Sequence, residues 1–294
     1  MYYRRKILLA ILQAFGNELD KMSLQKLLFL FSRQQTEKSF HFVPYKYGCY
    51  SFQANADLGA LVKYNLITES GNNWKKADTT DYIKDLKARD QIAIKYIKIQ
   101  YGGYNKDELV KLTYNNYPYY AINSTITANI LNPEEQAKVE KQKIFKTETV
   151  LFTIGYEGIS LEEYLNKLII NGVRVLCDVR KNSISMKYGF SKDQLQKACK
   201  GVGIEYVHIP EVGIESDKRQ ELNTQADYDK LFVFYKTHIL KNETAKQKEI
   251  LSLLENKKRI ALTCFEANIC QCHRKHLAES LSKLEGFKYE IKHI

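Results

Sequence analysis

The sequence lacks any run of about 18 consecutive apolar residues, the length that a membrane-spanning helix requires. Its first residues, Met1–Lys6, lack the apolar segment and the small-residue cleavage site of a secretory signal. From these two absences we expect a soluble, cytoplasmic protein with no membrane partner.

Cysteine is also scarce. The 294 residues include six cysteines, too few and too clustered toward one end for a disulfide scaffold, so we expect reduced thiols. Apolar residues make up 44% of the chain and charged residues 27%, which excludes a disordered or low-complexity protein. The length is about twice that of a typical domain and predicts two domains.

Basic residues exceed acidic ones, and the excess is unevenly distributed. Residues 1–147 carry a formal charge of +8 and residues 148–294 one of +3. A basic half is typical of proteins with phosphate-bearing partners, although the same charge also serves solubility. Nucleic acid or a nucleotide is therefore one expected partner, and a protein partner or a second copy of the chain, bound through the first half, is another.

Residues 1–79 have the pattern of a helical domain with a small hairpin. Apolar residues recur at helical spacing in residues 7–15 and 24–31, and the turn-rich residues 70–73 separate two strand patterns. Helices followed by a hairpin outline a winged helix, a fold that binds DNA in some proteins and docks partners in others. Residues 80–147 continue as a helical extension that closes with a linker rich in Glu, Lys and Gln.

Residues 148–294 change to short apolar strands that alternate with helices. The strand pattern occurs in residues 150–154, 173–177, 204–208 and 259–263. This alternation predicts an α/β fold with a mostly parallel sheet and helices on both of its faces. The chain is therefore expected to join a mainly helical, winged-helix-like domain to an α/β domain.

Ionisable side chains follow the ends of these strands, where ligands bind in open parallel sheets. Each of them also has a structural explanation, such as a turn cap, an ion pair or a partly buried histidine. Together, acid, base, thiol and guanidinium groups at four strand ends indicate a functional site. The expected catalytic residues are Glu157, Asp178, Glu266, Cys272 and His273. The expected ligand-binding residues are Tyr156, Arg180, His208 and Arg274.

Arg180 and Arg274 are expected to hold an anion, because a guanidinium group matches the oxygens of phosphate or carboxylate. Arg274 also lies near the predicted N-terminus of the last helix, which attracts negative charge. Glu266 or Asp178 would carry out acid–base chemistry, and Tyr156 would orient the ligand. The sequence has no dinucleotide-binding fingerprint, which favours hydrolysis or group transfer over redox chemistry, and we expect no cofactor.

The segment from Cys264 to Arg274 allows three interpretations. Its cysteines and histidine are zinc ligand types, but their spacing does not follow the knuckles of structural zinc sites, so we expect no metal. Cys272 at a helix N-terminus could instead have a lowered pKa and act as a nucleophile or redox thiol. The favoured interpretation makes the thiols small buried side chains beside a functional Glu266, His273 and Arg274.

Four motifs of the second half occur in the same order in a known family. They are Thr153-Ile-Gly-Tyr-Glu-Gly158, Asp178-Val-Arg180, Gly189-Phe-Ser191, and Cys264-Phe-Glu266 followed by Cys272-His-Arg274. Through them, residues 150–294 resemble the domain of unknown function 488 family. The resemblance implies an α/β fold and no particular reaction. Residues 178–183 depart from the usual form, in which a proline follows the arginine.

The first domain contains two motifs of another family. Through Leu24-Gln-Lys-Leu-Leu28 and Phe42-Val-Pro-Tyr-Lys-Tyr-Gly48 it resembles the SocA-like antitoxin (Panacea) domain, with Cys49 where that pattern has proline. This resemblance implies a toxin–antitoxin or phage-defence context and recognition of nucleic acid or of a partner protein.

Two classes of function remain open from the sequence. The first is a nucleotide- or nucleic-acid-directed enzyme, a hydrolase or transferase with an arginine-lined anion site at the strand ends. The alternative is a non-catalytic DNA-binding or partner-binding regulator that senses a small anionic ligand. A thiol or metal enzyme centred on Cys264 and Cys272 is a third, less favoured hypothesis.

Overall fold

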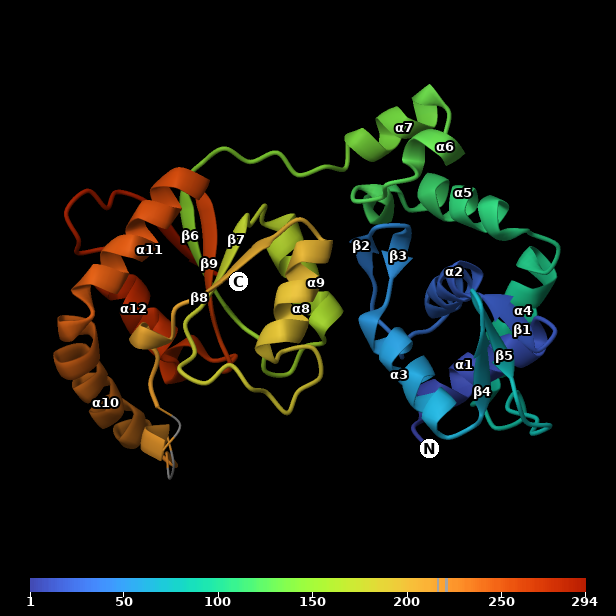
Figure 1. Cartoon of the computed structure of the whole chain (residues 1–294), viewed down its shortest axis with the longest axis horizontal. Coiled ribbons are helices and arrows are strands. Elements are labelled where there is room, and N and C mark those ends of the chain that lie inside the picture. Colours follow the sequence, from blue (N-terminus) through green and yellow to red (C-terminus); the bar gives the residue numbers. More distant parts are fainter. Residues whose placement is uncertain (216, 220–221) are drawn as a thin grey trace. The chain divides into compact units, whose positions relative to one another are not determined.

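A computed structural model of the chain describes residues 1–215, 217–219 and 222–294 (Figure 1). The chain divides into two compact units, residues 1–143 and 144–294. This division falls inside the stretch predicted as a linker. Each unit buries its own apolar side chains.

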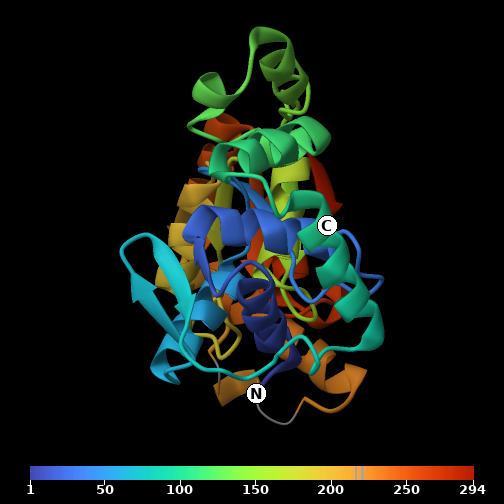
Figure 2. The same ribbon diagram turned by 90° about the vertical axis from the view of Figure 1, so that its right-hand side faces the viewer.

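The first part of the N-terminal unit has winged-helix topology. Its elements are α1 (Tyr3–Ala14), β1 (Glu18–Asp20), α2 (Lys21–Ser32), β2 (Val43–Tyr45), β3 (Gly48–Tyr50), α3 (Phe52–Lys63), β4 (Ile67–Ser70) and β5 (Asn73–Lys76). Strands β1, β5 and β4 form an antiparallel sheet in that order, and β2 pairs with β3 in a separate hairpin. The hairpin of β4 and β5, drawn in cyan, projects beyond the helices of this unit (Figure 2).

A helical extension completes the N-terminal unit. It consists of α4 (Ala88–Tyr101), α5 (Lys106–Asn116), the short 3-10 helix η1 (Pro118–Ala121), α6 (Thr127–Ile130) and α7 (Pro133–Glu140). The stretch predicted as a linker therefore includes a helix, α7, which begins with a capping box between Asn132 and Glu135. The mainly helical character expected for the N-terminal region is confirmed.

The C-terminal unit is an α/β domain. Its strands are β6 (Val150–Gly155), β7 (Val175–Asp178), β8 (Glu205–His208), β9 (Arg259–Cys264) and β10 (Glu290–His293). Its longer helices are α8 (Leu161–Ile170), α9 (Lys192–Gly201), α10 (Gln225–Phe234), α11 (Thr244–Lys257) and α12 (His273–Leu281). Short helical segments are η2 (Pro210–Val212), η3 (Asp217–Arg219), the π-helix η4 (Tyr235–Leu240) and η5 (Ile269–Gln271).

The five strands of this unit form one parallel sheet in the order β10-β6-β9-β7-β8. Helices α8 and α9 cover one face of the sheet, and α11 and α12 cover the other (Figure 1). Because both faces are covered, every residue of the central strand β9 is buried. The predicted α/β fold with flanking helices is confirmed.

A capping box fixes the start of α8, the helix that follows the first strand of the sheet. The Ser160 hydroxyl accepts a hydrogen bond from the Glu163 backbone N–H, and the Glu163 carboxylate accepts one from the Ser160 N–H. We expect Ser160→Ala to lower the free energy of unfolding of the C-terminal unit by about 1 kcal/mol, because the Glu163 N–H loses the hydroxyl oxygen that accepts from it. Thermal unfolding followed by circular dichroism measures the change. Ser160→Asp, which keeps a capping oxygen, should stay within about 0.5 kcal/mol of the wild type.

Among the residues that the structure describes, no helix combines the length and apolar character needed to cross a bilayer.

Candidate active site at the carboxyl edge of the parallel sheet

The order of the strands places a crevice between β6 and β9. These two strands are neighbours, but β6 continues through α8 to β7, whereas β9 continues through α12 to β10. Helices α8 and α12 lie on opposite faces of the sheet (Figure 1). When the chain leaves two neighbouring strands toward opposite faces of the sheet, a crevice opens beyond the carboxyl ends of those strands. In open α/β sheets this crevice is the usual ligand site. The predicted location of the site thus coincides with the switch point of the sheet.

The backbones that leave β6 and β9 lie against each other at this edge. Gly155 pairs with Cys264, and the N–H groups of Tyr156 and Glu157 both donate to the Phe265 carbonyl, at 3.1 and 2.9 Å. A Cβ atom at Gly155 would lie 1.9 Å from the Glu266 carbonyl oxygen. Only glycine therefore allows this approach, which brings Tyr156 and Glu266 to the same edge.

A pocket of about 370 Å³ opens at this edge, and we call it the switch-point pocket. Its lining contains three basic side chains and one acidic one, which makes the cavity positive. The lining residues are Tyr156, Arg180, Lys181, Asn182, Ile184, Ser185, Met186, Lys187, Ile214, Cys264, Phe265 and Glu266. The segment from 180 to 187, which follows β7, supplies most of the lining.

A buried ion pair supports one wall of the switch-point pocket. The Arg180 guanidinium donates from Nε and a terminal nitrogen to the two Asp178 carboxylate oxygens, at 2.8 and 2.5 Å. Its other terminal nitrogen donates to the Tyr156 hydroxyl at 2.6 Å, and the Tyr206 hydroxyl donates to Asp178 at 2.6 Å. Asp178 is fully buried and Arg180 is 5% exposed. Burial opposes the charge on Arg180, but the hydrogen bonds and charge of Asp178 outweigh it and raise the Arg180 pKa.

These contacts give Arg180 and Arg274 different surroundings. Arg180 lines the switch-point pocket while its guanidinium holds Asp178. Arg274 is 2% exposed and donates to the backbone carbonyls of Glu266 and Ala267, at 2.5 and 3.2 Å. Within the described part of the chain, Arg274 Nε has no hydrogen-bond partner. Arg274 thus holds the turn that carries Glu266, and a joint anion clamp of the two arginines stays a prediction.

The remaining predicted side chains hold the loops around the pocket. The exposed Glu157 carboxylate accepts a hydrogen bond from the Ala267 N–H at 2.9 Å, which ties the turns after β6 and β9 together. At the end of β8, His208 Nε2 lies 2.9 Å from the Arg180 carbonyl oxygen, so this half-buried histidine supports the segment that lines the pocket.

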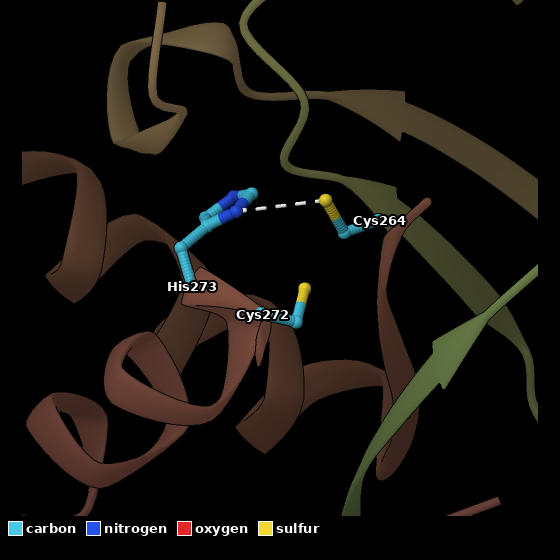
Figure 3. Close-up of side chains that lie close together, drawn as sticks. All are labelled: Cys264, Cys272 and His273. Atoms are coloured by element: carbon cyan, nitrogen blue, oxygen red, sulfur yellow. Dashed lines mark hydrogen bonds between the residues drawn. The ribbon is translucent and has the colours of Figure 1, made fainter. Parts of the chain in front are cut away.

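Next to the pocket, two thiols and an imidazole point toward one another (Figure 3). The ligand atoms of Cys264, Cys272 and His273 all lie within 4.8 Å of one another, and all three residues are buried. Burial raises the pKa of the Cys272 thiol, and the adjacent Cys264 and Glu266 raise it further. This direction counts against a Cys272 thiolate as the nucleophile, because burial disfavours the charged form of a thiol. Among the described residues, these three form a group whose ligand atoms lie close enough together to hold a metal ion.

Among the lining residues that were not predicted as site residues, three bear on ligand binding. Lys181 and Lys187 follow the Asp178–Arg180 motif, and Phe265 lies between Cys264 and Glu266. Lys181 and Phe265 lie close after the ends of β7 and β9, which was the available signal for them, since loops at the carboxyl edge line the ligand crevice. Lys187 lies farther along the loop after β7, where that signal does not reach. The other predicted residues surround the same edge and connect through the hydrogen bonds described above.

Comparison with known proteins bears on the C-terminal unit only. No curated protein matches the chain in sequence. The resemblance of the N-terminal domain to the SocA-like antitoxin domain stays a prediction. Residues 160–281 match the model of the family described as domain of unknown function DUF488, which confirms the resemblance of the second half to that family.

Proposed function

We propose that the C-terminal unit binds a phosphate-bearing ligand, a nucleotide or the end of a nucleic-acid strand, and acts on it by hydrolysis or group transfer. The observation that carries this proposal is the switch-point pocket, where three basic side chains and an exposed aromatic ring line one cavity at the carboxyl edge of the sheet. A volume of about 370 Å³ is in the range of small-molecule sites.

The basic side chains favour an anionic ligand. Lys181 is exposed, and the half-buried Lys187 donates from Nζ to the Tyr156 carbonyl oxygen at 2.5 Å, which holds the ammonium at the pocket wall. Burial lowers the pKa of Lys187 and thus favours a ligand that neutralises its charge. A phosphate group between Lys181 and Lys187 would supply that charge.

The apolar part of the lining favours a base or another flat ring. The Phe265 side chain is 42% exposed and Met186 is fully exposed, although both line the pocket. An aromatic ring at the edge of a cationic cavity offers a stacking surface for a nucleobase, and such stacking tolerates any base. Glu266 is the acidic side chain of the lining, and a ligand in the pocket would have this carboxylate available for acid–base chemistry.

The helix of the N-terminal unit that would read DNA in a helix-turn-helix fold, α3, has fewer basic side chains than the switch-point pocket. Helix α3 contains one basic residue, Lys63, and its buried Asp57 pairs with Arg4 and Arg5. The phosphate-bearing ligand is therefore assigned to the switch-point pocket, and DNA or a partner protein at the N-terminal unit remains the alternative, regulatory proposal. DNA binding by that unit would weaken steeply with salt, because phosphate contacts release counterions.

Calorimetric titration of the whole chain with ATP, AMP and short single-stranded DNA tests this proposal. Lys181→Ala and Lys187→Ala are each expected to weaken binding about tenfold, because a hydrogen bond to a charged group contributes about 1.5–3 kcal/mol. Lys200→Ala, an exposed lysine of α9 outside the pocket lining, is the matched control and should leave the affinity unchanged.

The same titration separates the two functional classes. Ligand conversion that Glu266→Gln abolishes supports an enzyme, whereas binding without conversion supports a sensor. Equal affinities of the wild type and the two pocket variants would reject the switch-point pocket as the phosphate site.

A further inference from the structure

The Cys264, Cys272 and His273 side chains meet although seven residues separate the two cysteines. Cys264 ends β9, Cys272 is the residue before α12, and His273 is its first residue. The chain turns back through η5 between them, which brings the two sulfur atoms and the imidazole to one point (Figure 3). Spacing along the sequence alone therefore did not predict this arrangement.

The distances suit a tetrahedral ion. Cys264 Sγ lies 3.5 Å from His273 Nδ1, and the three ligand atoms lie within 4.8 Å of one another. Zn–S distances of about 2.3 Å and Zn–N distances of about 2.0–2.1 Å place tetrahedral S and N ligands about 3.6 Å apart. Small side-chain rotations thus suffice to bring all three atoms onto one ion.

The second nitrogen of His273 orients the ring for this role. His273 Nε2 lies 3.1 Å from the Val179 carbonyl oxygen, which as an acceptor requires the proton on Nε2. Nδ1 then presents its lone pair toward the two sulfur atoms. A hydrogen bond from the remote ring nitrogen to a backbone carbonyl is the usual support of a metal-binding histidine.

We propose that Cys264, Cys272 and His273 bind a zinc ion next to the switch-point pocket. Two thiolates and an imidazole are soft ligands that select zinc over magnesium or calcium. When zinc binds, the two thiols release their protons to solvent and form two Zn–S bonds, without any change of oxidation state. Metal binding does not depend on the proposed function.

The fourth coordination position of the proposed zinc ion would lie at the switch-point pocket. Three protein ligands with one open position are the arrangement of catalytic zinc sites, whereas structural sites have four protein ligands. Glu266 Oε2 lies 3.1 Å from Cys264 Sγ, and both residues belong to the pocket lining. The fourth position then lies beside Glu266, where a water molecule, an oxygen of the ligand or the Glu266 carboxylate would complete the coordination. This last step rests on the proposed function.

Metal analysis of the whole chain, purified under reducing conditions, tests the proposal. We expect about one zinc ion per chain in the wild type and loss of the metal in Cys272→Ser and His273→Ala. Cys270→Ser is the matched control: Cys270 is exposed and belongs to the same segment, and this variant should retain zinc. Cobalt titration of the stripped wild type adds a readout that needs no variant, because thiolate ligands give cobalt an intense charge-transfer absorption.

The outcomes separate the metal site from the proposed function. A wild-type chain that carries no zinc and develops no thiolate–cobalt absorption overturns the metal site. A disulfide between Cys264 and Cys272 in the reduced preparation, shown by mass spectrometry, overturns it as well. Zinc binding without nucleotide binding would leave the metal site standing and reject the proposed function, and nucleotide binding without zinc would do the reverse.

Discussion

Asp178→Asn is expected to lower the free energy of unfolding of the C-terminal unit by about 3–5 kcal/mol, the typical cost of leaving one charge of a buried pair without its partner. Asp178 is fully buried and accepts hydrogen bonds from the Arg180 guanidinium, the Arg180 N–H and the Tyr206 hydroxyl. The amide keeps the size of the carboxylate but loses its charge and half of its acceptor capacity. Arg180 would remain buried as an uncompensated cation.

The two units allow an internal reference in this experiment. The chain has one tryptophan, Trp74, which lies in the N-terminal unit. Tryptophan fluorescence should therefore report an unchanged transition, while circular dichroism shows an earlier one for the C-terminal unit. Asp193→Asn, an exposed acid of α9, is the control and should stay within about 0.5 kcal/mol.

A double substitution tests whether the pair acts as a unit. Arg180→Met alone leaves the Asp178 carboxylate buried without its cation and should destabilise as strongly as Asp178→Asn. Combining both changes should cost clearly less than the sum of the single effects, because the double variant buries no uncompensated charge. Additive losses would show that the ion pair contributes little coupling energy to this wall of the pocket.

Gly155→Ala is expected to abolish ligand binding in the switch-point pocket and to destabilise the C-terminal unit by about 1–3 kcal/mol, the usual cost of overpacking. The added methyl group would meet backbone atoms, 1.9 Å from the Glu266 carbonyl oxygen and 2.7 Å from its carbon. The turn after β9 would have to move, and with it the Phe265 carbonyl that accepts from Tyr156 and Glu157. Pocket residues on both strands would then lose their positions.

Calorimetry with AMP and thermal unfolding measure the two effects of Gly155→Ala. Gly59→Ala, at a helical glycine of α3 with open space around it, is the control for the same chemical change and should leave both quantities intact. Wild-type affinity in Gly155→Ala would show that the turn after β9 does not form the ligand site.

Much of the C-terminal fold was accessible from the sequence, because its three central strands, β6, β7 and β9, are buried on both faces. The apolar runs at 150–154 and 259–263 correspond to β6 and β9. Ser160, a residue type that favours the N-cap of a helix, caps α8. The sequence pattern predicts one helical tract from about Tyr228 to Glu255, which the structure divides into three segments, α10, η4 and α11. Strand β1 in the N-terminal unit is only three residues long, which is too short to show the alternation of apolar and polar residues that identifies a strand.

The site was predicted in outline and not in its contacts. Polar side chains at the carboxyl ends of parallel strands lie at the same edge of the sheet, independently of the loop conformations. Tyr156, Arg180 and Glu266 could therefore be predicted as neighbours. The sequence left open whether Arg180 pairs with Asp178 or with Glu266, and the choice of Asp178 depends on side-chain packing. The pocket lysines lie in a loop without periodicity. The meeting of Cys264 with Cys272 depends on a reversal of the chain that linear spacing does not encode.

The affinity difference between AMP and adenosine, measured by calorimetry on the wild-type chain, tests the central claim most directly. If the basic lining of the switch-point pocket holds a phosphate group, AMP should bind at least about 100-fold more tightly than adenosine, because two charge-assisted hydrogen bonds contribute about 3 kcal/mol or more. The double variant of Lys181 and Lys187 should remove most of that difference. Equal affinities for AMP and adenosine would contradict the account.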